Sequence, residues 1–221
     1  MSRATHTLRK LAAPALALLS LCAFAACRHT PAKDAPAPPA QPAPAPAAET
    51  QLSAEEEATN SRPLKLPLAG PRLLVRKKER RVVLYDGEAV VRVYRMVLGF
   101  APEGDKVRQG DGRTPEGEFY VCMKNEKIRF YLSLGLSYPD EAAARRGFGE
   151  GLITREQRDR IVSAAREKRC PPWDTPLGGE IMIHGGGVVE DWTLGCVALE
   201  NEHIKELFDA VPRGTPVRIE P

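Results

Sequence analysis

The chain has 221 residues, of which 43% are hydrophobic and 28% charged, and its formal net charge is +3 at pH 7. Three of the 32 basic residues and none of the 29 acidic ones precede residue 27, so the rest of the chain is balanced. A balanced chain without a dense basic stripe argues against nucleic acid or an anionic membrane surface as a partner. We expect the one basic run, RKKERR at 76–81, to be a solvated strand end.

The first 26 residues are typical of an export signal. A basic start, MSRATHTLRK, precedes LAAPALALLSLCAFAA, which is too short and too rich in alanine for a comfortable membrane span. Ala25 and Ala26 stand before Cys27, an arrangement that resembles the lipobox of bacterial lipoproteins, whose cysteine is lipidated. A signal-peptidase cut nearby is the alternative. Either route predicts a periplasmic protein in an oxidising compartment. Arg28 after the cysteine resembles the enterobacterial pattern for sorting to the outer membrane.

A linker is expected between the export signal and the folded part of the chain. Residues 31–48, PAKDAPAPPAQPAPAPAA, have almost no large side chain to bury, and they favour an extended polyproline II spacer. The polar segment QLSAEEEATNSRP follows it. We therefore expect a lipid-anchored, flexible linker over 27–69 and one folded domain over 70–221.

From residue 70 onward the sequence has the pattern of β-strands. RLLVRK, RRVVLYD and EAVVRVYRMVLG are rich in β-branched residues, and Asp86-Gly87 between the last two is a strong hairpin signal. TPEGEFYVCMKN, IMIH, CVAL and TPVRIE predict further strands. Short strands with glycine and proline between them predict a mainly β domain with a sandwich-like or barrel-like core.

Two helices are predicted within this β pattern. Thr154 and Gln157 form a capping box before a helix over about 155–168, whose thin apolar face indicates an insertion on the surface. The second helix, EHIKELFDAV, has a clear apolar face; we expect Asn201 to cap it and Pro212 to end it.

HGGGVVEDWTLGC, residues 184–196, contains the candidate catalytic residues. A thiol attacks a carbonyl as thiolate, but with a pKa of about 8.5 it is only slightly ionised at neutral pH, so a neighbouring imidazole that takes its proton would activate it. His184 ends one short strand and Cys196 begins another, which fits this requirement. Gly195 lets the chain turn sharply before the thiol. We expect a backbone carbonyl at Gly185 to orient the histidine.

The residues alone leave other interpretations open. Cys196 could be an inert thiol and His184 a core histidine. A zinc site could use Cys170, His184, Cys196 and His203, but no C-x-x-C or H-x-x-x-H pair occurs and His203 is expected to face solvent, so we predict no metal and no cofactor. Cys122 and Cys170 could form a disulfide or remain separate thiols.

Two motifs together resemble a known family. HG, a variable loop and T-x-G-C-V-x-L are similar to the catalytic signature of the L,D-transpeptidases (the YkuD-type domain), which is usually HG…S/T-x-G-C-I/V-R-L/M. GRTPEGEFY at 112–120 is similar to that family's T-P-x-G-x-F/Y strand. The resemblance covers about residues 70–221. It implies a β-sandwich-like fold and a cysteine acyl-enzyme formed on peptidoglycan stem peptides at the L-centre of diaminopimelate.

The resemblance also implies a role for individual residues. Cys196 corresponds to the nucleophile and His184 to the general base, while Gly185 and Gly195 are backbone positions of the motif. Thr193 stands at the hydroxyl position. We expect it to contact substrate, together with three other residues of the loop, Trp192, Gly186 and Gly187.

Ala198 departs from the family pattern, which usually has arginine there. Its loss would remove a cation that could hold a carboxylate, and it resembles a side branch with hydrolytic members that release the lipoprotein bound to peptidoglycan. LSLGLSYPD and PPWDTPLGGEIMIHGGG are similar to that branch too. The expected activity is transpeptidation. The alternatives are hydrolysis of the same acyl-enzyme, as a carboxypeptidase or amidase, and a catalytically silent peptidoglycan-binding lipoprotein. The oligomeric state is not indicated.

Overall fold

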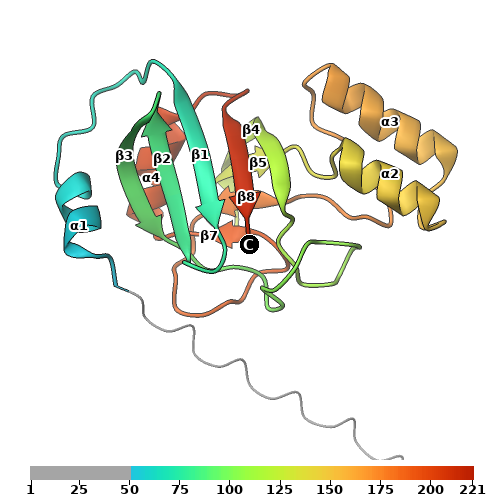
Figure 1. The fold of residues 1–221 in the computed structure, drawn as a ribbon, viewed down its shortest axis with the longest axis horizontal. Helices are drawn as coiled ribbons and strands as arrows, with labels where there is room; N and C mark the ends of the chain where they lie inside the picture. Colours follow the sequence, from blue (N-terminus) through green and yellow to red (C-terminus); the bar gives the residue numbers. More distant parts are fainter. Residues whose placement is uncertain (1–50) are drawn as a thin grey trace, which may run out of the picture. The chain divides into compact units, whose positions relative to one another are not determined.

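The computed structural model describes residues 51–221 (Figure 1), and the predicted export signal, Cys27 and the Pro/Ala-rich segment lie outside the described residues. Eight strands form a mixed sheet, which confirms the mainly β fold. They are β1 (Pro71–Arg76), β2 (Arg81–Asp86), β3 (Ala89–Arg95), β4 (Gly117–Ile128), β5 (Tyr131–Leu136), β6 (Met182–His184), β7 (Val197–Ala198) and β8 (Pro216–Glu220). Their order is β3-β2-β1-β8-β4-β5-β6-β7; β1 and β8 are parallel, as are β6 and β7, and the other neighbours are antiparallel.

The sheet curls, so that the segment after β3 lies beside β7, the strand that follows the candidate nucleophile Cys196. The first part of β4 pairs with β8 and the rest with β5, so one long strand takes part in both halves of the sheet. Beyond the end of β3, Val97 and Ala198 exchange both backbone hydrogen bonds, at 3.0 and 2.9 Å. Gly99 forms a further bridge to Thr193. The first and last strands of the sheet order are thereby joined beside the candidate site.

One apolar core fills the interior of the curled sheet. α4 (Asn201–Ala210) contributes Ile204, Leu207 and Phe208 to it and contacts β5 and β6. Each such side chain, when fully buried, stabilises the fold by roughly 1.5–3 kcal/mol. The prediction that Asn201 caps this helix is wrong: Glu200 occupies the cap position without a side-chain bond. Asn201 is already helical, and its side chain is used elsewhere.

A helical insertion lies between β5 and β6 (Figure 1). The capping box of Thr154 and Gln157 starts α3 (Arg155–Arg166), as predicted. A second helix of the insertion, α2 (Glu141–Gly149), was not predicted; it packs beside α3 and is capped by the Asp140 side chain. Its short EAAARRGFG sequence has little hydrophobic periodicity, because it buries only alanine and glycine.

A disulfide joins the insertion to the sheet. Cys122 of β4 and Cys170, which follows α3, are bonded, with their Cα atoms 5.1 Å apart. The sequence left this pairing open, because it does not show the distance between the two residues. The bond closes a loop with a sequence separation of 48 residues. Loop-closure entropy assigns such a crosslink a stabilisation of about 4 kcal/mol.

The segment before the sheet departs from the predicted flexible linker. α1 (Ala54–Asn60) begins with a capping box of Ser53 and Glu56 and contacts β3 (Figure 1). The Asn60 amide pairs reciprocally with the backbone of Val93, at 2.7 and 2.9 Å. Glu56 forms an ion pair of 2.9 Å with Arg81. These bonds hold the last part of the expected linker on the domain.

The basic run at 76–81 is not a solvated strand end. Lys77 and Arg81 are only 2% and 5% exposed, and each is paired with a carboxylate, Glu116 and Glu56 respectively.

The expected hairpin between β2 and β3 is present. Asp86 pairs with Ala89 as the last residue of β2, so the turn lies at Gly87 and the residue after it, and Gly87, not Asp86, has a positive φ. None of the helices within residues 51–221 has the length and hydrophobicity that a membrane crossing requires.

Candidate active site

Two adjacent parallel strands bring His184 and Cys196 to the same part of the sheet. His184 is the last residue of β6 and pairs in register with Ala198 of β7. Cys196 immediately precedes β7, two residues before that partner. In a regular ladder this spacing places two side chains on the same face of the sheet, because strand side chains alternate with period two. The short connection between the strands is the HGGG…TLGC loop of the sequence analysis.

The thiol of Cys196 is half-buried and faces a backbone carbonyl. Its Sγ donates to the carbonyl oxygen of Glu180 at 3.4 Å. Glu180 has a φ of 54°, a left-handed conformation that is unfavourable for this residue type. Burial raises the pKa of the Cys196 thiol to about 11, and a backbone hydrogen bond at Met182 and the charge of Lys106 act in the opposite direction. A thiol with this pKa is protonated at rest, so it needs a base to react at neutral pH.

His184 has the properties of such a base. It is 3% exposed, and its Nδ1 lies 2.6 Å from the carbonyl oxygen of Gly185. That carbonyl can only accept, so Nδ1 carries the proton and Nε2 presents its lone pair. Burial lowers the pKa of His184, which keeps the ring neutral at neutral pH. The carbonyl at Gly185 therefore stands where the sequence analysis expects an orienting partner.

Two aromatic residues enclose the imidazole. Phe130, from the turn between β4 and β5, stacks on the His184 ring with centroids 4.9 Å apart. Trp192 meets the same ring edge-on at 5.5 Å and lies 5.1 Å from Phe130. Phe130 was not predicted as a site residue, because it belongs to no motif and lies more than fifty residues from the histidine. These contacts hold the imidazole and exclude water from its faces.

The three glycines after His184 are required either by close contacts or by a positive φ. A Cβ atom at Gly185 would lie 2.5 Å from Oδ1 of Asn201 and 2.9 Å from the carbonyl oxygen of Phe130. The same Asn201 oxygen accepts the backbone N–H of Gly186 at 3.1 Å. Gly186 and Gly187 both have positive φ, and Gly187 donates to Leu199. The side chain predicted to cap α4 thus anchors the loop instead.

The turn before Cys196 is held by Thr193. Its hydroxyl donates to the carbonyl oxygen of Cys196 at 2.8 Å and accepts the N–H of Gly195 at 3.1 Å. These two bonds occupy the hydroxyl within the turn, and the side chain is only 3% exposed. The contact between Thr193 and substrate stays a prediction. Gly195 has a φ of 126°, and a Cβ there would lie 2.5 Å from the carbonyl oxygen of Arg113. Only glycine fits this approach.

Asp191 ties the middle of the loop to the sheet. Its Oδ1 accepts the N–H of Leu98 at 2.7 Å, and its Oδ2 pairs with Arg80 at 2.6 Å. The neighbouring Trp192 donates its indole N–H to the carbonyl oxygen of Gly187 at 3.3 Å. The loop is therefore crosslinked at both of its ends and at its centre.

The position of the missing arginine is closed rather than open to substrate. Ala198 is 0% exposed and packs with Val97 and Val188, and Trp192 packs against this small cluster. An arginine at 198 would have to displace these side chains. A cation of the insertion could replace the missing arginine. Arg146 is one of these cations, but its guanidinium is bound to Asp105 at 2.9 Å and to the carbonyl oxygen of Lys106 at 2.8 Å.

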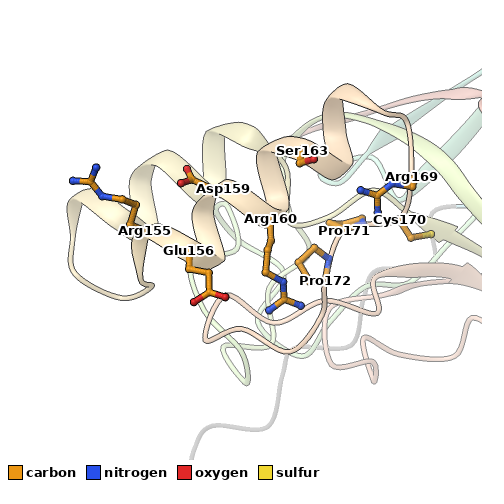
Figure 2. A pocket seen from close by; sticks show the side chains of 9 residues that line it. All are labelled: Arg155, Glu156, Asp159, Arg160, Ser163, Arg169, Cys170, Pro171 and Pro172. Atoms are coloured by element: carbon orange, nitrogen blue, oxygen red, sulfur yellow. The ribbon is translucent and has the colours of Figure 1, made fainter.

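The other candidate features contribute nothing to this site. Figure 2 shows an open groove between α3 and the segment around Cys170, which includes none of the predicted catalytic residues. In residues 51–221, no three His, Cys, Asp or Glu side chains come together as a metal site. His203 is not solvent-facing as expected: it is half-buried, with its ring 5.3 Å from that of Tyr94.

Comparison with known proteins identifies the family. Residues 70–219 match the family model for YkuD, the L,D-transpeptidase catalytic domain. The chain therefore belongs to the YkuD family of L,D-transpeptidase domains, which confirms the resemblance inferred from the two motifs. A search of curated proteins finds no match.

Three solved structures are among those to which the chain is similar. An L,D-transpeptidase from Xylanimonas cellulosilytica is 17% identical with a TM-score of 0.42, over 72% of this chain and 64% of that one. The helical cell shape determining protein Pgp2 from Campylobacter jejuni is 20% identical with a TM-score of 0.47, over 68% and 47%. For an L,D-transpeptidase variant from Enterococcus faecium the values are 15%, 0.42, 69% and 50%. The chain spans about half to two thirds of the lengths of these proteins.

Proposed function

We propose that the protein is a peptidoglycan L,D-transpeptidase that works through an acyl-enzyme at Cys196. The observation that carries the proposal is the pairing of β6 with β7. It places a buried, neutral His184 at the end of β6 and a half-buried thiol directly before β7. The substrate is a stem tetrapeptide, cut after the L-centre of its diaminopimelate. Family membership supports this substrate class.

The reaction proceeds in two steps, acylation of Cys196 and transfer of the acyl group to an acceptor. His184 Nε2 takes the thiol proton, and the Cys196 sulfur attacks the carbonyl carbon of the scissile amide. Collapse of the tetrahedral intermediate breaks the C–N bond, and the proton on His184 passes to the leaving amine. An acceptor amine then attacks the thioester and His184 takes its proton. The C–S bond breaks, and the proton on His184 passes to the departing Cys196 sulfur, which restores the thiol and the neutral base. The N–H of Gly195 is engaged by Thr193, so other groups must stabilise the oxyanion.

Hydrolysis of the same thioester is the second candidate. The closed position of Ala198 favours it, because no cation is available there to hold a carboxylate of an incoming stem peptide. A charge-assisted hydrogen bond of that kind contributes roughly 1.5–3 kcal/mol. Water needs no such contact. The products would then be trimmed stem peptides or, with a protein-linked substrate, a released protein.

The proposal includes the location of the enzyme. Lipidation of Cys27 and the Pro/Ala-rich spacer would anchor it in the periplasm at the outer membrane. The spacer would let the domain reach peptidoglycan, since polyproline II extends by about 3.1 Å per residue. Cys27→Ser should then move the protein out of the membrane fraction, and a wild-type protein found wholly soluble would rule the anchor out.

Mass spectrometry of muropeptides from sacculi incubated with the purified full chain tests the activity. We expect cross-linked dimers with wild type and no change with Cys196→Ala. Trimmed monomers in place of dimers would support the hydrolase. Unchanged muropeptides with a folded wild type would leave the catalytically silent lipoprotein.

Position 198 can be tested in the same assay. Because an arginine there meets Trp192, Ala198→Arg should be measured alone and together with Trp192→Ala. A rise in the ratio of dimers to monomers in the double variant would show that the cation selects the acceptor, and an unchanged ratio would show that it does not.

A further inference from the structure

The middle of the loop between β6 and β7 is held by side chains and not by its backbone. Gly187 and Thr193 each donate a backbone N–H to the chain beside the loop. Within the described residues 51–221, the backbone groups of residues 188–192 between them make no hydrogen bond. Trp192, which meets the His184 ring edge-on at 5.5 Å, belongs to this stretch. A side-chain attachment must therefore keep Trp192 against the imidazole.

The Asp191 carboxylate supplies this attachment. It directly precedes Trp192, and its Oδ1 accepts the N–H of Leu98 at 2.7 Å. The carbonyl oxygen of Leu98 accepts the N–H of Thr193 at 3.1 Å, so the loop binds both backbone groups of this residue. The second oxygen of Asp191, Oδ2, binds the Arg80 guanidinium at 2.6 Å. Arg80 thus determines which way the carboxylate points.

Arg80 lies in the turn between β1 and β2 in an unfavourable conformation. Its φ is 54°, in the left-handed region that residues other than glycine rarely adopt. Its guanidinium Nε is buried and has no hydrogen-bond partner among the described residues, which is costly for a charged group. A buried ion pair by itself is weak evidence for stability. Outliers that a fold retains at such a cost indicate a functional constraint.

The rest of the turn fixes the direction of the guanidinium. Its Nη1 and the backbone N–H of Arg80 both donate to the carbonyl oxygen of Lys77, the second of them at 3.2 Å. The carbonyl oxygen of Arg80 accepts the N–H of Met96 at 3.1 Å, and Lys77 donates its N–H to Glu220 of β8 at 3.0 Å. The arginine is therefore anchored to the sheet on one side and presents Nη2 to Asp191 on the other.

We propose that Arg80 is a positioning residue whose guanidinium orients the Asp191 carboxylate, which in turn holds Trp192 against the ring of His184. The inference rests on the proposed function only in taking His184 as the base. No bond to Arg80 forms or breaks in the reaction. The Trp192 indole also donates to the carbonyl oxygen of Gly187 at 3.3 Å, so a shift of Asp191 moves one aromatic wall of the imidazole.

The next residue supplies a matched control. Arg81 is 5% exposed and forms an ion pair of 2.9 Å with Glu56 of α1. Its guanidinium also binds the carbonyl oxygens of Gln51, Glu79 and Arg80, all of which lie outside the loop between β6 and β7. Arg80→Met and Arg81→Met therefore each remove a paired arginine from adjacent positions, but only Arg80 is bonded to the loop.

Tryptophan fluorescence measures the position of Trp192. The chain has two tryptophans, and the buried indole N–H of Trp173 has no hydrogen-bond partner in the described part of the chain. Trp173→Phe therefore leaves Trp192 as the single emitter without breaking a hydrogen bond. In this background of the folded full chain, Arg80→Met should shift the emission to longer wavelength and increase its quenching by acrylamide, because the indole becomes more exposed to water. Arg81→Met should change neither.

The rate of acylation of Cys196 by a carbapenem measures the effect on the base. Arg80→Met should slow it about tenfold to a hundredfold, since a misplacement of about 1 Å can have an effect of this size. Asp191→Asn, which keeps an acceptor for Leu98, should slow it similarly, and the double variant should be no slower than either single variant. Arg81→Met should stay within about twofold of wild type, even if it lowers the melting temperature as much.

Unchanged fluorescence and acylation in Arg80→Met, equal changes in Arg81→Met, or losses that add in the double variant would overturn the inference. Arg80→Gly is the second variant should Arg80→Met not fold, because glycine adopts a positive φ without strain. It should give the same changes. Fluorescence needs neither peptidoglycan nor carbapenem. A wild type that is not acylated would therefore count against the proposed function and leave the fluorescence test intact.

Discussion

The loop between β6 and β7 and the helical insertion between β5 and β6 are held in the fold in different ways. The loop is fixed through its backbone: Asn201, Thr193 and Asp191 bind its N–H and C=O groups or those of the chain beside it. The insertion is fixed through side chains, by the Cys122–Cys170 bond and the Arg146–Asp105 pair. The difference predicts that small changes in the loop impair catalysis, whereas changes in the insertion mainly lower stability.

The largest effect is expected for Gly185→Ala. Its Cβ would collide with Asn201 and Phe130, so the loop must shift and His184 loses its position. A misplacement of about 1 Å can cost about a hundredfold in rate. The resemblance to the family adds that a carbapenem should acylate Cys196, so the rate of that mass adduct is the measurement.

The matched variant for this comparison is Gly149→Ala in α2. A Cβ at Gly149 meets nothing within 4 Å, and alanine is the better helix former by up to about 1 kcal/mol. We expect unchanged acylation and an unchanged or higher melting temperature. Equal losses in both glycine variants would contradict the proposed difference between the two regions.

The acid limb of acylation is the second prediction. Burial lowers the pKa of His184 from its ordinary value of 6.5, so the neutral base persists below that pH. Carbapenem acylation should stay level as the pH falls through 6.5 and then decrease about tenfold per pH unit. The unfolded chain binds this proton more readily, so the stability contributed by His184 is lost as the pH falls below 6.5. A rate that halves at pH 6.5 would exclude a buried histidine as the base.

Removal of the disulfide ranks next. Cys122→Ser with Cys170→Ser should lower the free energy of unfolding by roughly 2–5 kcal/mol, measured by urea denaturation. Acylation of Cys196 in the folded fraction should change less than about twofold, because Cys122 belongs to β4 and Cys170 follows α3, outside the loop and the two strands that flank it. Two additional reactive thiols in unfolded, unreduced wild type would show instead that the bond does not form.

Arg146→Met should have a smaller effect than any of the preceding changes. Its pair with Asp105 is about one third exposed, so screening limits its contribution to roughly 0.5–1 kcal/mol. Arg145→Met, which breaks the more exposed pair with Glu141, is the control and should cost less still. Thermal unfolding of the two variants measures the difference. A larger loss of stability in Arg145→Met than in Arg146→Met would contradict the view that the bonds of Arg146 to Asp105 and Lys106 hold the insertion on the domain.

Local signals predicted much of this structure, and long-range contacts account for what they missed. The strands, α3 with its capping box and the two motifs that resemble the family are visible in short windows of sequence. The stacking of Phe130 on His184 and the pairing of the two cysteines depend on residues about fifty positions apart. Asn201 looked like a helix cap because its residue type favours that role, but its side chain binds Gly186 instead. Burial of Lys77 and Arg81 likewise depends on partners that the local pattern does not show.

The place of β8 in the sheet has a consequence for how the domain assembles. β8 lies between β1 and β4, so the strand at 216–220 completes hydrogen bonds begun at 71–76. A chain that emerges with its N-terminus first must hold the edge of β1 unpaired until about 140 later residues have followed. Such pairing over a large sequence separation folds slowly and leaves the edge open to aggregation or chaperones meanwhile. The thiol of Cys196 therefore reaches its final surroundings, His184 and the adjoining turns, only after nearly the whole domain has emerged.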